Sequence, residues 1–259
     1  MEFFRKVGQS IDYRLTGYRF SKAVTLFLNY LIQRKVRRDV RFLRNEVIYE
    51  PRNQDFVSLC DKYGSDKGSL QTENHPYPWE PHTYASLYSF LFSHCRDSFK
   101  HVLECGIGTN DPNLKSNMSK SGMPGASLRV WRDFFPSAQV IGIDIDEKTM
   151  FKDERINTYV VDQTDVQSIR NFLSEFSNTT FDLVIDDGLH EFHAGRNLFE
   201  EVFPKLSPGG IYVIEDVLMQ DLNKYKNYFS STQHDVTYVL LGRKNVKIGD
   251  NCLILVRRY

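Results

Sequence analysis

Short apolar runs and amphipathic segments alternate along the chain from residue 99 onward. The apolar runs predict strands at residues 101–104, 139–144, 158–162, 181–186 and 211–215. The segments between them repeat apolar side chains at helical spacing, which predicts helices at residues 125–135, 166–176 and 193–206. Strands that read as continuous apolar runs are buried on both faces. The alternation therefore predicts a mostly parallel sheet with helices on both sides.

The pattern changes near the end of the chain. Residues 234–241 and 252–257 read as two strands that flank Lys247-Ile-Gly-Asp-Asn251, a sequence rich in turn-forming residues. Two strands joined in this way form an antiparallel hairpin. The predicted fold class is α/β, with a Rossmann-like, mostly parallel sheet closed by a C-terminal antiparallel hairpin strand.

Two regions precede the sheet domain, which we place at residues 99–259. Residues 1–50 are predicted to be a basic, amphipathic helical extension, because Phe, Val and Leu recur there at helical spacing. Residues 51–98 are predicted to form a cap that contributes to the active site. The cap is expected to contain helices at residues 55–63 and 82–95.

Charge is distributed unevenly over the 259 residues, although the formal net charge is zero. Residues 1–44 carry eleven Lys and Arg against three Asp and Glu, a net charge of +8, so the remainder carries −8. The overall balance argues against a nucleic-acid partner. Two roles remain open for residues 1–47: contact with an anionic membrane, or packing on the acidic remainder of the chain or on a second subunit as a homo-oligomer.

Cysteine usage and hydropathy indicate the compartment. The four cysteines are scattered and form no CxxC pair, which is typical of a reducing environment. The longest apolar stretch, at residues 23–32, is too short to span a bilayer, which needs about 20 residues. No secretory signal is recognisable in the basic first 44 positions. We expect a cytoplasmic protein, with peripheral binding at the inner face of the membrane as an open alternative.

A glycine pair follows the first predicted strand, in Glu104-Cys-Gly106-Ile-Gly108. Glycine at this position lets the backbone turn tightly and approach a ligand closely. A dinucleotide fingerprint would place a third glycine where Asp111 stands, and polar residues 109–124 separate the glycines from the next helix. This departure disfavours a pyrophosphate site and fits S-adenosylmethionine (SAM), which has no phosphate. We expect the 109–124 insertion to form a lid over the acceptor site.

Polar residues also follow the next strands. Asp144 can accept hydrogen bonds from ribose hydroxyls, and Asp162-Gln163 is placed to meet an adenine. Each acid alone could be an ordinary strand-end residue, but the series favours a cofactor site. The predicted cofactor-binding residues are Glu104, Gly106, Gly108, Ser127, Asp144, Asp162, Gln163 and Asp186.

Three further acids, Asp187, Glu215 and Asp216, follow the fourth and fifth predicted strands. Parallel strands end at the same rim of a sheet, so these carboxylates can converge there. Converging carboxylates repel one another unless a cation joins them, and an all-oxygen set suits Mg²⁺. The alternative is that one or two of these acids cap helices or bind the cofactor. For Asp186, such a role and a role as a metal ligand both stay open.

Histidine supplies the candidate base. His190 lies three residues after Asp187, and a neutral imidazole can accept a proton from a hydroxyl near neutral pH. We therefore predict His190 and Asp187 as the catalytic residues. His193 is a second candidate, although it is expected to begin the next helix.

Four stretches together resemble a known group. They are Asp61-Lys-Tyr-Gly-Ser-Asp-Lys-Gly68, the segment at residues 125–135, Ile185-Asp-Asp-Gly-Leu-His190 and Gly209-Gly-Ile-Tyr-Val-Ile-Glu-Asp216. The resemblance spans residues 55–220 and is to class I SAM-dependent methyltransferases, specifically bacterial metal-dependent sugar O-methyltransferases of the macrolide-sugar 2′-O type. It implies SAM and Mg²⁺ as cofactors, with sugar oxygens completing the metal's ligands. The group commonly has serine where this chain has Leu189.

The resemblance also implies that the cap segment lies over the active site. The residues it places near SAM or the acceptor are Tyr63, Asp66, Lys67, His82 and Tyr84, with His193 added as a further substrate candidate. The function expected from all these features is O-methylation of a sugar hydroxyl, in a surface glycan or a glycosylated metabolite. Two alternatives stay open: a nicotinamide-dependent oxidoreductase on a Rossmann sheet, and a non-catalytic SAM-fold binding module.

Overall fold

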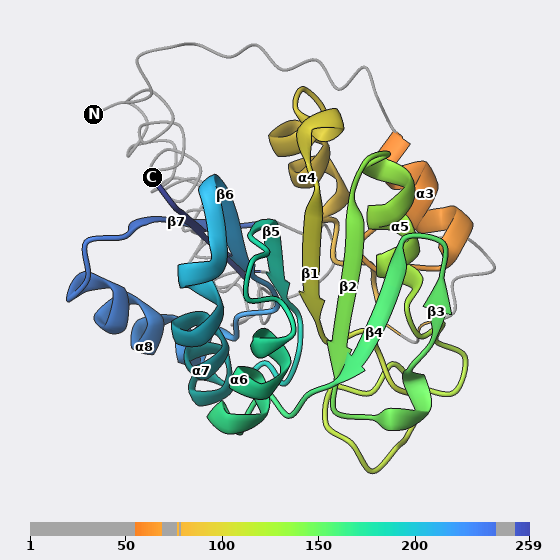
Figure 1. Ribbon diagram of the computed structural model, residues 1–259. Coiled ribbons are helices and arrows are strands. Elements are labelled where there is room, and N and C mark those ends of the chain that lie inside the picture. The colour runs from red at the N-terminus through yellow and green to blue at the C-terminus, as the bar shows by residue number, and fades with distance from the viewer. Residues whose placement is uncertain (1–54, 69–76, 78, 242–251) are drawn as a thin grey trace, which may run out of the picture. The chain divides into compact units, whose positions relative to one another are not determined.

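The computed structural model describes residues 55–259 apart from 69–76, 78 and 242–251 (Figure 1). One sheet with the strand order β3-β4-β2-β1-β5-β6-β8-β7 forms its centre. The strands on one side are β1 (His101–Cys105), β2 (Gln139–Asp144), β3 (Lys152–Asp153) and β4 (Ile156–Val160). Those on the other side are β5 (Phe181–Asp186), β6 (Leu206–Ile214), β7 (Asp235–Leu240) and β8 (Cys252–Arg257).

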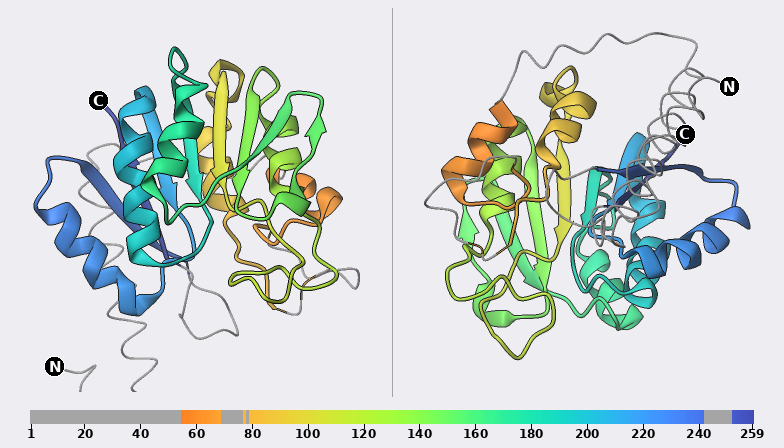
Figure 2. Two further views of the ribbon diagram at one scale, coloured as in Figure 1. Left: turned by 60° about the horizontal axis from the view of Figure 1, so that its bottom comes forward. Right: turned by 180° about the vertical axis from the view of Figure 1, so that it is seen from behind.

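Helices cover both faces of the sheet (Figures 1 and 2). One face carries α3 (Asp55–Tyr63), α4 (Ala85–Phe92) and α5 (Ala126–Phe134). The other carries α6 (Val166–Ser174), α7 (Phe192–Val202) and α8 (Met219–Ser230). Short 3₁₀ turns lie at η1 (Arg96–Ser98), η2 (Glu147–Thr149) and η3 (Phe203–Lys205).

The sheet confirms the predicted fold class. Strands β4, β2, β1, β5 and β6 pair in parallel, whereas β8 pairs antiparallel with β6 and β7 antiparallel with β8. The next strands along the chain, β2 and then β4, lie on one side of β1 in the sheet, whereas β5 and β6 lie on its other side. The strand order therefore reverses at β1. In open α/β sheets, ligands bind at such a reversal point, beyond the carboxyl ends of the strands. In Figure 1 these ends of β1, β2 and β4 point toward the lower edge.

Aromatic packing joins the cap segment to the sheet domain. Phe56 of α3 lies 4.9 Å from the rings of both Trp131 and Phe134 on α5, and 5.6 Å from Tyr88 on α4. All four rings are buried in a core cluster shared with β1 and β2. Burying such a side chain contributes about 1.5–3 kcal/mol. The helices before β1 are thus held firmly against the sheet.

Most predicted elements agree with the structure to within a few residues. The two-residue strand β3 was not predicted, and three larger differences follow. Helix α8 (Met219–Ser230) was not predicted, although its buried Leu222, Tyr225 and Phe229 recur at helical spacing. Strand β4 ends at Val160, so Asp162 follows the strand instead of ending it. Strand β6 begins at Leu206 and so includes residues 207–210, which lie between the predicted helix at 193–206 and the predicted strand at 211–215. The predictions for residues 1–50 lie outside the described residues.

Candidate active site

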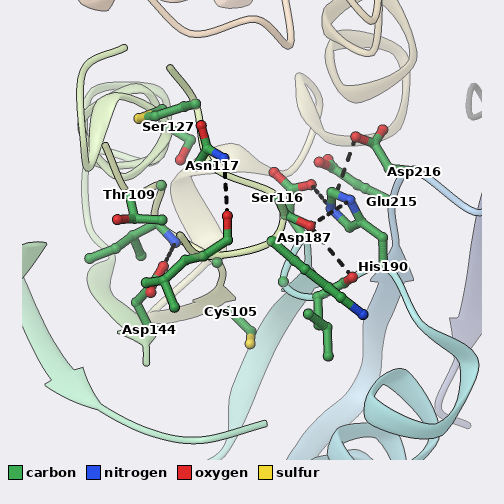
Figure 3. A pocket seen from close by; sticks show the side chains of 18 of the residues that line it. Cys105, Thr109, Ser116, Asn117, Ser127, Asp144, Asp187, His190, Glu215 and Asp216 are labelled. Atoms are coloured by element: carbon green, nitrogen blue, oxygen red, sulfur yellow. Dashed lines mark hydrogen bonds and ion pairs between the residues drawn. The ribbon is translucent and has the colours of Figure 1, made fainter. Parts of the chain in front are cut away.

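A cavity of about 430 Å³ opens at the carboxyl ends of the central strands (Figure 3). This volume is in the range of small-molecule sites. Both groups of predicted residues line the same cavity. From the cofactor group it includes Gly106, Gly108, Ser127, Asp144, Asp162 and Gln163, and from the catalytic and metal group Asp187, His190, Glu215 and Asp216.

Gly106 begins the loop after β1 with a positive φ of 84°. A Cβ atom built there would lie 2.0 Å from the backbone oxygen of Asp187. The backbone after β1 can therefore run against the backbone after β5 only because residue 106 has no side chain. Gly108 also has a positive φ, of 89°. The glycine pair thus shapes the cavity floor, as its position in the sequence suggests.

Asp144 supports this loop from the end of β2. Its carboxylate accepts hydrogen bonds from the backbone nitrogens of Ile107 at 2.9 Å and Asp146 at 3.0 Å. Burial raises the pKa of Asp144, and these backbone hydrogen bonds oppose that rise. Asp146 in turn accepts a 2.5 Å hydrogen bond from the Thr109 hydroxyl. The sequence analysis missed Asp146, a second acid that fixes the loop two residues after Asp144.

Glu104, a predicted cofactor residue, points into the protein interior and is not among the residues that line the cavity. Its Oε2 accepts hydrogen bonds from the Ser127 hydroxyl at 2.8 Å and the Trp131 indole at 3.1 Å. Burial raises the pKa of Glu104 to about 7, and the Lys67 ammonium partly offsets that rise. Two neighbours of Glu104, Ser127 and Lys67, do line the cavity, so Glu104 can affect a ligand there through either of them.

Asp186, another predicted cofactor residue, is also buried and lies outside the main cavity lining. The Gln163 side-chain amide donates a 2.6 Å hydrogen bond to it. Gln163 also accepts a 3.0 Å hydrogen bond from the backbone nitrogen of Leu189. Burial raises the pKa of Asp186 to about 6. Asp186 therefore orients Gln163 and the loop after β5.

Asp187, His190 and Asp216 form a compact cluster at the rim (Figure 3). One ligating atom from each lies within 4.8 Å of the others, a geometry that could hold a metal ion. His190 Nε2 is 3.2 Å from Asp187 Oδ1 and 4.0 Å from Asp216 Oδ2. His190 and Asp216 also adopt positive φ values of 58° and 50°, which non-glycine residues do mainly at functional sites.

The carboxylates strongly affect the ionisation of His190. Burial lowers the pKa of this imidazole, but Asp187, Asp216 and Asp186 outweigh burial and raise it to about 9. The sequence analysis expected a neutral imidazole near neutral pH. The surrounding carboxylates instead favour the protonated imidazole, because their negative charge stabilises it. A role as base requires added positive charge near these carboxylates.

Glu215, the third predicted metal ligand, is not part of this cluster of three residues and bonds to other side chains. Its carboxylate accepts short hydrogen bonds from the Lys67 ammonium and the Tyr88 hydroxyl. The Lys67 Nζ also lies 2.6 Å from Asp187 Oδ2. Lys67 was expected near SAM or the acceptor, and the structure places it between the carboxylates themselves.

Asp216 is held by residues from the cap segment. The Tyr84 hydroxyl donates a short hydrogen bond to its Oδ1, and His82 Nδ1 lies 3.1 Å from the same oxygen. His82 Nε2 is 3.5 Å from Asp66, which also accepts a 2.9 Å hydrogen bond from the Trp79 indole. Four of the predicted cap residues, Asp66, Lys67, His82 and Tyr84, therefore line the cavity.

Two other candidates lie apart from the cavity. The Tyr63 hydroxyl donates a 2.5 Å hydrogen bond to Asp133 on α5. His193 lies on α7 with a side chain 56% exposed, beside Glu191. Neither is among the residues that line the cavity. Their positions favour structural or surface roles.

The 109–124 insertion covers part of the cavity. Leu114, Lys115, Ser116, Asn117 and Met118 contribute to its lining. The Ser116 hydroxyl lies 3.4 Å from His190 Nδ1, so the insertion contacts the candidate base directly. This contact was not apparent from the sequence, since Ser116 and His190 are 74 positions apart.

The strand order and the crevice beside β1 define a class I methyltransferase arrangement, and residues 122–217 match a family described as a methyltransferase domain. The chain therefore has the class I methyltransferase fold, with a methyltransferase-domain match over residues 122–217. It is 35% identical over 161 residues to 8-demethyl-8-alpha-L-rhamnosyl tetracenomycin-C 2′-O-methyltransferase of Streptomyces olivaceus, covering 62% of this chain and 37% of that protein. It is also 35% identical over 136 residues to mycinamicin VI 2″-O-methyltransferase of Micromonospora griseorubida, covering 52% of this chain and 32% of that protein.

A solved methyltransferase structure also has a similar fold. The mycinamycin-pathway methyltransferase MycE, in complex with Mg, SAH and mycinamycin VI, matches with a TM-score of 0.57 at 26% identity. That match covers 80% of this chain and 55% of the MycE chain. This chain spans about a third of the length of the curated relatives that it matches.

Proposed function

We propose that this protein is a SAM-dependent O-methyltransferase that acts on a sugar hydroxyl with the help of a divalent cation. The observation that carries the proposal is that Asp187, His190, Glu215 and Asp216 line the same cavity as the glycine pair after β1. Sugar O-methyltransferases among the relatives support the acceptor class. The alternative of a nicotinamide-dependent oxidoreductase is disfavoured, because the fold and the family match both indicate a methyltransferase domain.

The cavity divides into a cofactor part and an acceptor part. Gly106, Gly108 and Asp144 would hold SAM at the ends of β1 and β2, while Asp162 and Gln163 would face its adenine. Glu104 and Ser127 would support this part from beneath. The cap residues His82 and Tyr84, which contact Asp216, and Asp66, which contacts His82, would face the acceptor.

The carboxylate cluster fits a hard divalent cation. Asp187 and Asp216 offer oxygen atoms close together, and Mg²⁺ prefers such ligands. We assign Asp187, Glu215 and Asp216 as the residues that would hold it. When bound, the ion would supply positive charge that favours ionisation of a sugar hydroxyl.

The protein's own residues would then perform three tasks. Asp187 would orient the His190 imidazole, which would accept the hydroxyl proton at a ring nitrogen. The acceptor oxygen would bond to the methyl carbon as that carbon's bond to sulfur breaks. The cap and the 109–124 insertion would hold the two reactants in line, and such positioning supplies much of the rate of a displacement reaction.

The natural acceptor belongs to one of two classes. It is a lipid-linked surface glycan assembled at the cytoplasmic face of the membrane, or a glycosylated metabolite like those named for the relatives. Either acceptor would place the protein in the cytoplasm. No helix in the described part of the chain is long and apolar enough to cross a membrane.

Calorimetry and mass spectrometry test the proposal together. S-adenosylhomocysteine (SAH) should bind, and glycans from cells with the gene should carry a methyl group absent from cells without it. Chelation should abolish turnover, and Mg²⁺ should restore it. Full turnover in excess chelator would remove the metal from the mechanism. SAH binding without any methylated product would favour the non-catalytic binding module.

A further inference from the structure

Lys67 is a buried cation inside the carboxylate cluster. Its side chain is only 3% exposed, and its Nζ is bonded to Asp187 and Glu215. The same Nζ lies 3.4 Å from Glu104 Oε1. One ammonium group thus faces three carboxylates that come from the ends of β1, β5 and β6.

A divalent cation held by Asp187 and Glu215 would need oxygen atoms that Lys67 now occupies. Two cations a few ångströms apart in a buried site repel each other strongly. Lysine has a flexible four-carbon stem, so its ammonium can move without a change in the sheet rim. The ammonium and the ion therefore compete for the same oxygens.

Glu104 offers a second position for the ammonium. Its Oε1 is buried and has no hydrogen-bond partner, whereas Oε2 is satisfied by Ser127 and Trp131. A buried carboxylate oxygen left without a hydrogen bond is costly. A small shift of the Lys67 Nζ toward Glu104 would satisfy this oxygen and release Asp187 and Glu215.

We propose that Lys67 is an exchangeable internal cation: it neutralises Asp187 and Glu215 in the ion-free protein and passes to Glu104 when a divalent cation binds. This inference rests on the proposed function only in taking a divalent cation to bind at this rim. It assigns Lys67 a positioning role, and it gives Glu104 a role as the carboxylate that receives the displaced ammonium.

The first test replaces the ammonium by an apolar chain of similar length. Lys67→Met should bind Mn²⁺ about tenfold more tightly than the unmodified protein, because the competing charge is gone. Without a divalent ion the variant should melt at a lower temperature, since its carboxylates are no longer neutralised. Millimolar Mg²⁺ should restore the melting temperature. The matched control is Lys100→Met, which changes an exposed lysine outside the carboxylate cluster.

Calorimetry with Mn²⁺ and thermal melting decide the outcome without any measurement of turnover. Mn²⁺ affinity that is unchanged or weaker in Lys67→Met would overturn the exchange, as would a loss of melting temperature that Mg²⁺ does not reverse. A second variant, Glu104→Gln, keeps the volume of the receiving group but removes its charge. It should bind Mn²⁺ about tenfold more weakly. Unchanged affinity would overturn the role of Glu104 and, if Lys67→Met does not fold, the whole proposal.

These results are separate from those of the proposed function. If the unmodified protein methylates its acceptor in excess chelator, the metal has no part in the reaction, yet Mn²⁺ can still exchange with Lys67. If the protein methylates its acceptor but neither it nor Lys67→Met binds Mn²⁺, the exchange is wrong while methyl transfer stands.

Discussion

Gly106 lies where the end of β1 meets the backbone that follows β5. Its positive φ and the 2.0 Å approach of the Asp187 oxygen to a built Cβ set two separate requirements for glycine. Gly209 shares the first requirement, with a φ of 81°, but nothing lies within 4 Å of its built Cβ. Comparing alanine substitutions at the two positions therefore distinguishes the effect of backbone strain from that of a direct steric clash.

We predict that Gly106→Ala costs about 3 kcal/mol or more of unfolding free energy and strongly weakens SAH binding. Gly209→Ala should cost only about 1 kcal/mol, since it adds backbone strain alone. Denaturant unfolding and SAH calorimetry measure both effects. Equal stability losses in the two variants would contradict the close approach at Gly106.

His190 is the residue on which the proposed chemistry most depends. We predict that His190→Ala lowers the rate of methyl transfer by about 10²–10⁴, the usual contribution of a positioned base, and leaves SAH affinity unchanged. His94→Ala, at an exposed position, is the control. Steady-state kinetics with a methylatable glycan or glycoside measure the effect. An active His190→Ala enzyme would remove this residue from the reaction.

At the scale of elements, α3 is fastened to α5 through Asp133. Its carboxylate accepts hydrogen bonds from Tyr63 at 2.5 Å, Arg132 at 2.8 Å and Lys62 at 3.1 Å. Burial raises the pKa of Asp133, but these donors outweigh burial and lower it to about 2. This contact helps to hold the cap, and with it Lys67, over the cavity.

We predict that Asp133→Asn lowers the unfolding free energy by about 1–2 kcal/mol at neutral pH, after allowance for partial exposure. A carboxyl with a lowered folded pKa stabilises the protein above its unfolded pKa, here near 3.8. The difference between the variant and the unmodified protein should therefore shrink as pH falls from 4 toward 2. Asp97→Asn, at an exposed position of η1, is the control for denaturant unfolding across this pH range. A difference that does not depend on pH would contradict the proposed contacts.

At the scale of the whole molecule, the charge asymmetry between residues 1–44 and the rest has no structural account, because the first 54 residues lie outside the description. The membrane and oligomer interpretations of residues 1–47 therefore both stay predictions. Each basic residue near an anionic membrane contributes on the order of 1 kcal/mol, so several together could hold the protein at the surface.

A liposome flotation assay distinguishes these interpretations. If residues 1–47 bind membranes, we expect the protein to float with anionic lipid at low salt and to sink as salt screens the attraction. Neutral liposomes provide the control. Failure to float at any salt, together with a dimer that dissociates when residues 1–47 are removed, would establish an oligomerisation arm.

The sequence by itself determined the sheet and the rim of the site. Apolar periodicity is local, so the strands and most helices could be located from it, and the topology then brought Asp187, Glu215 and Asp216 to one edge. The same periodicity was present in α8 (Met219–Ser230), which was nevertheless not predicted. Pairing with β5 begins β6 at Leu206, before the predicted strand at residues 211–215.

Only the tertiary structure decided which side chains meet. Lys67 lies 120 positions from Asp187 and 148 from Glu215, and no local pattern links them. The inward turn of Glu104, the attachment of Tyr63 to Asp133 and the exposure of His193 likewise depend on how separate elements pack. The ionisation of His190 depends on packing too, because its pKa reflects the summed charge of acids from two strands. Residue types and spacing identify the available chemical groups, but their distances and burial, which set pairing and charge, exist only in the folded chain.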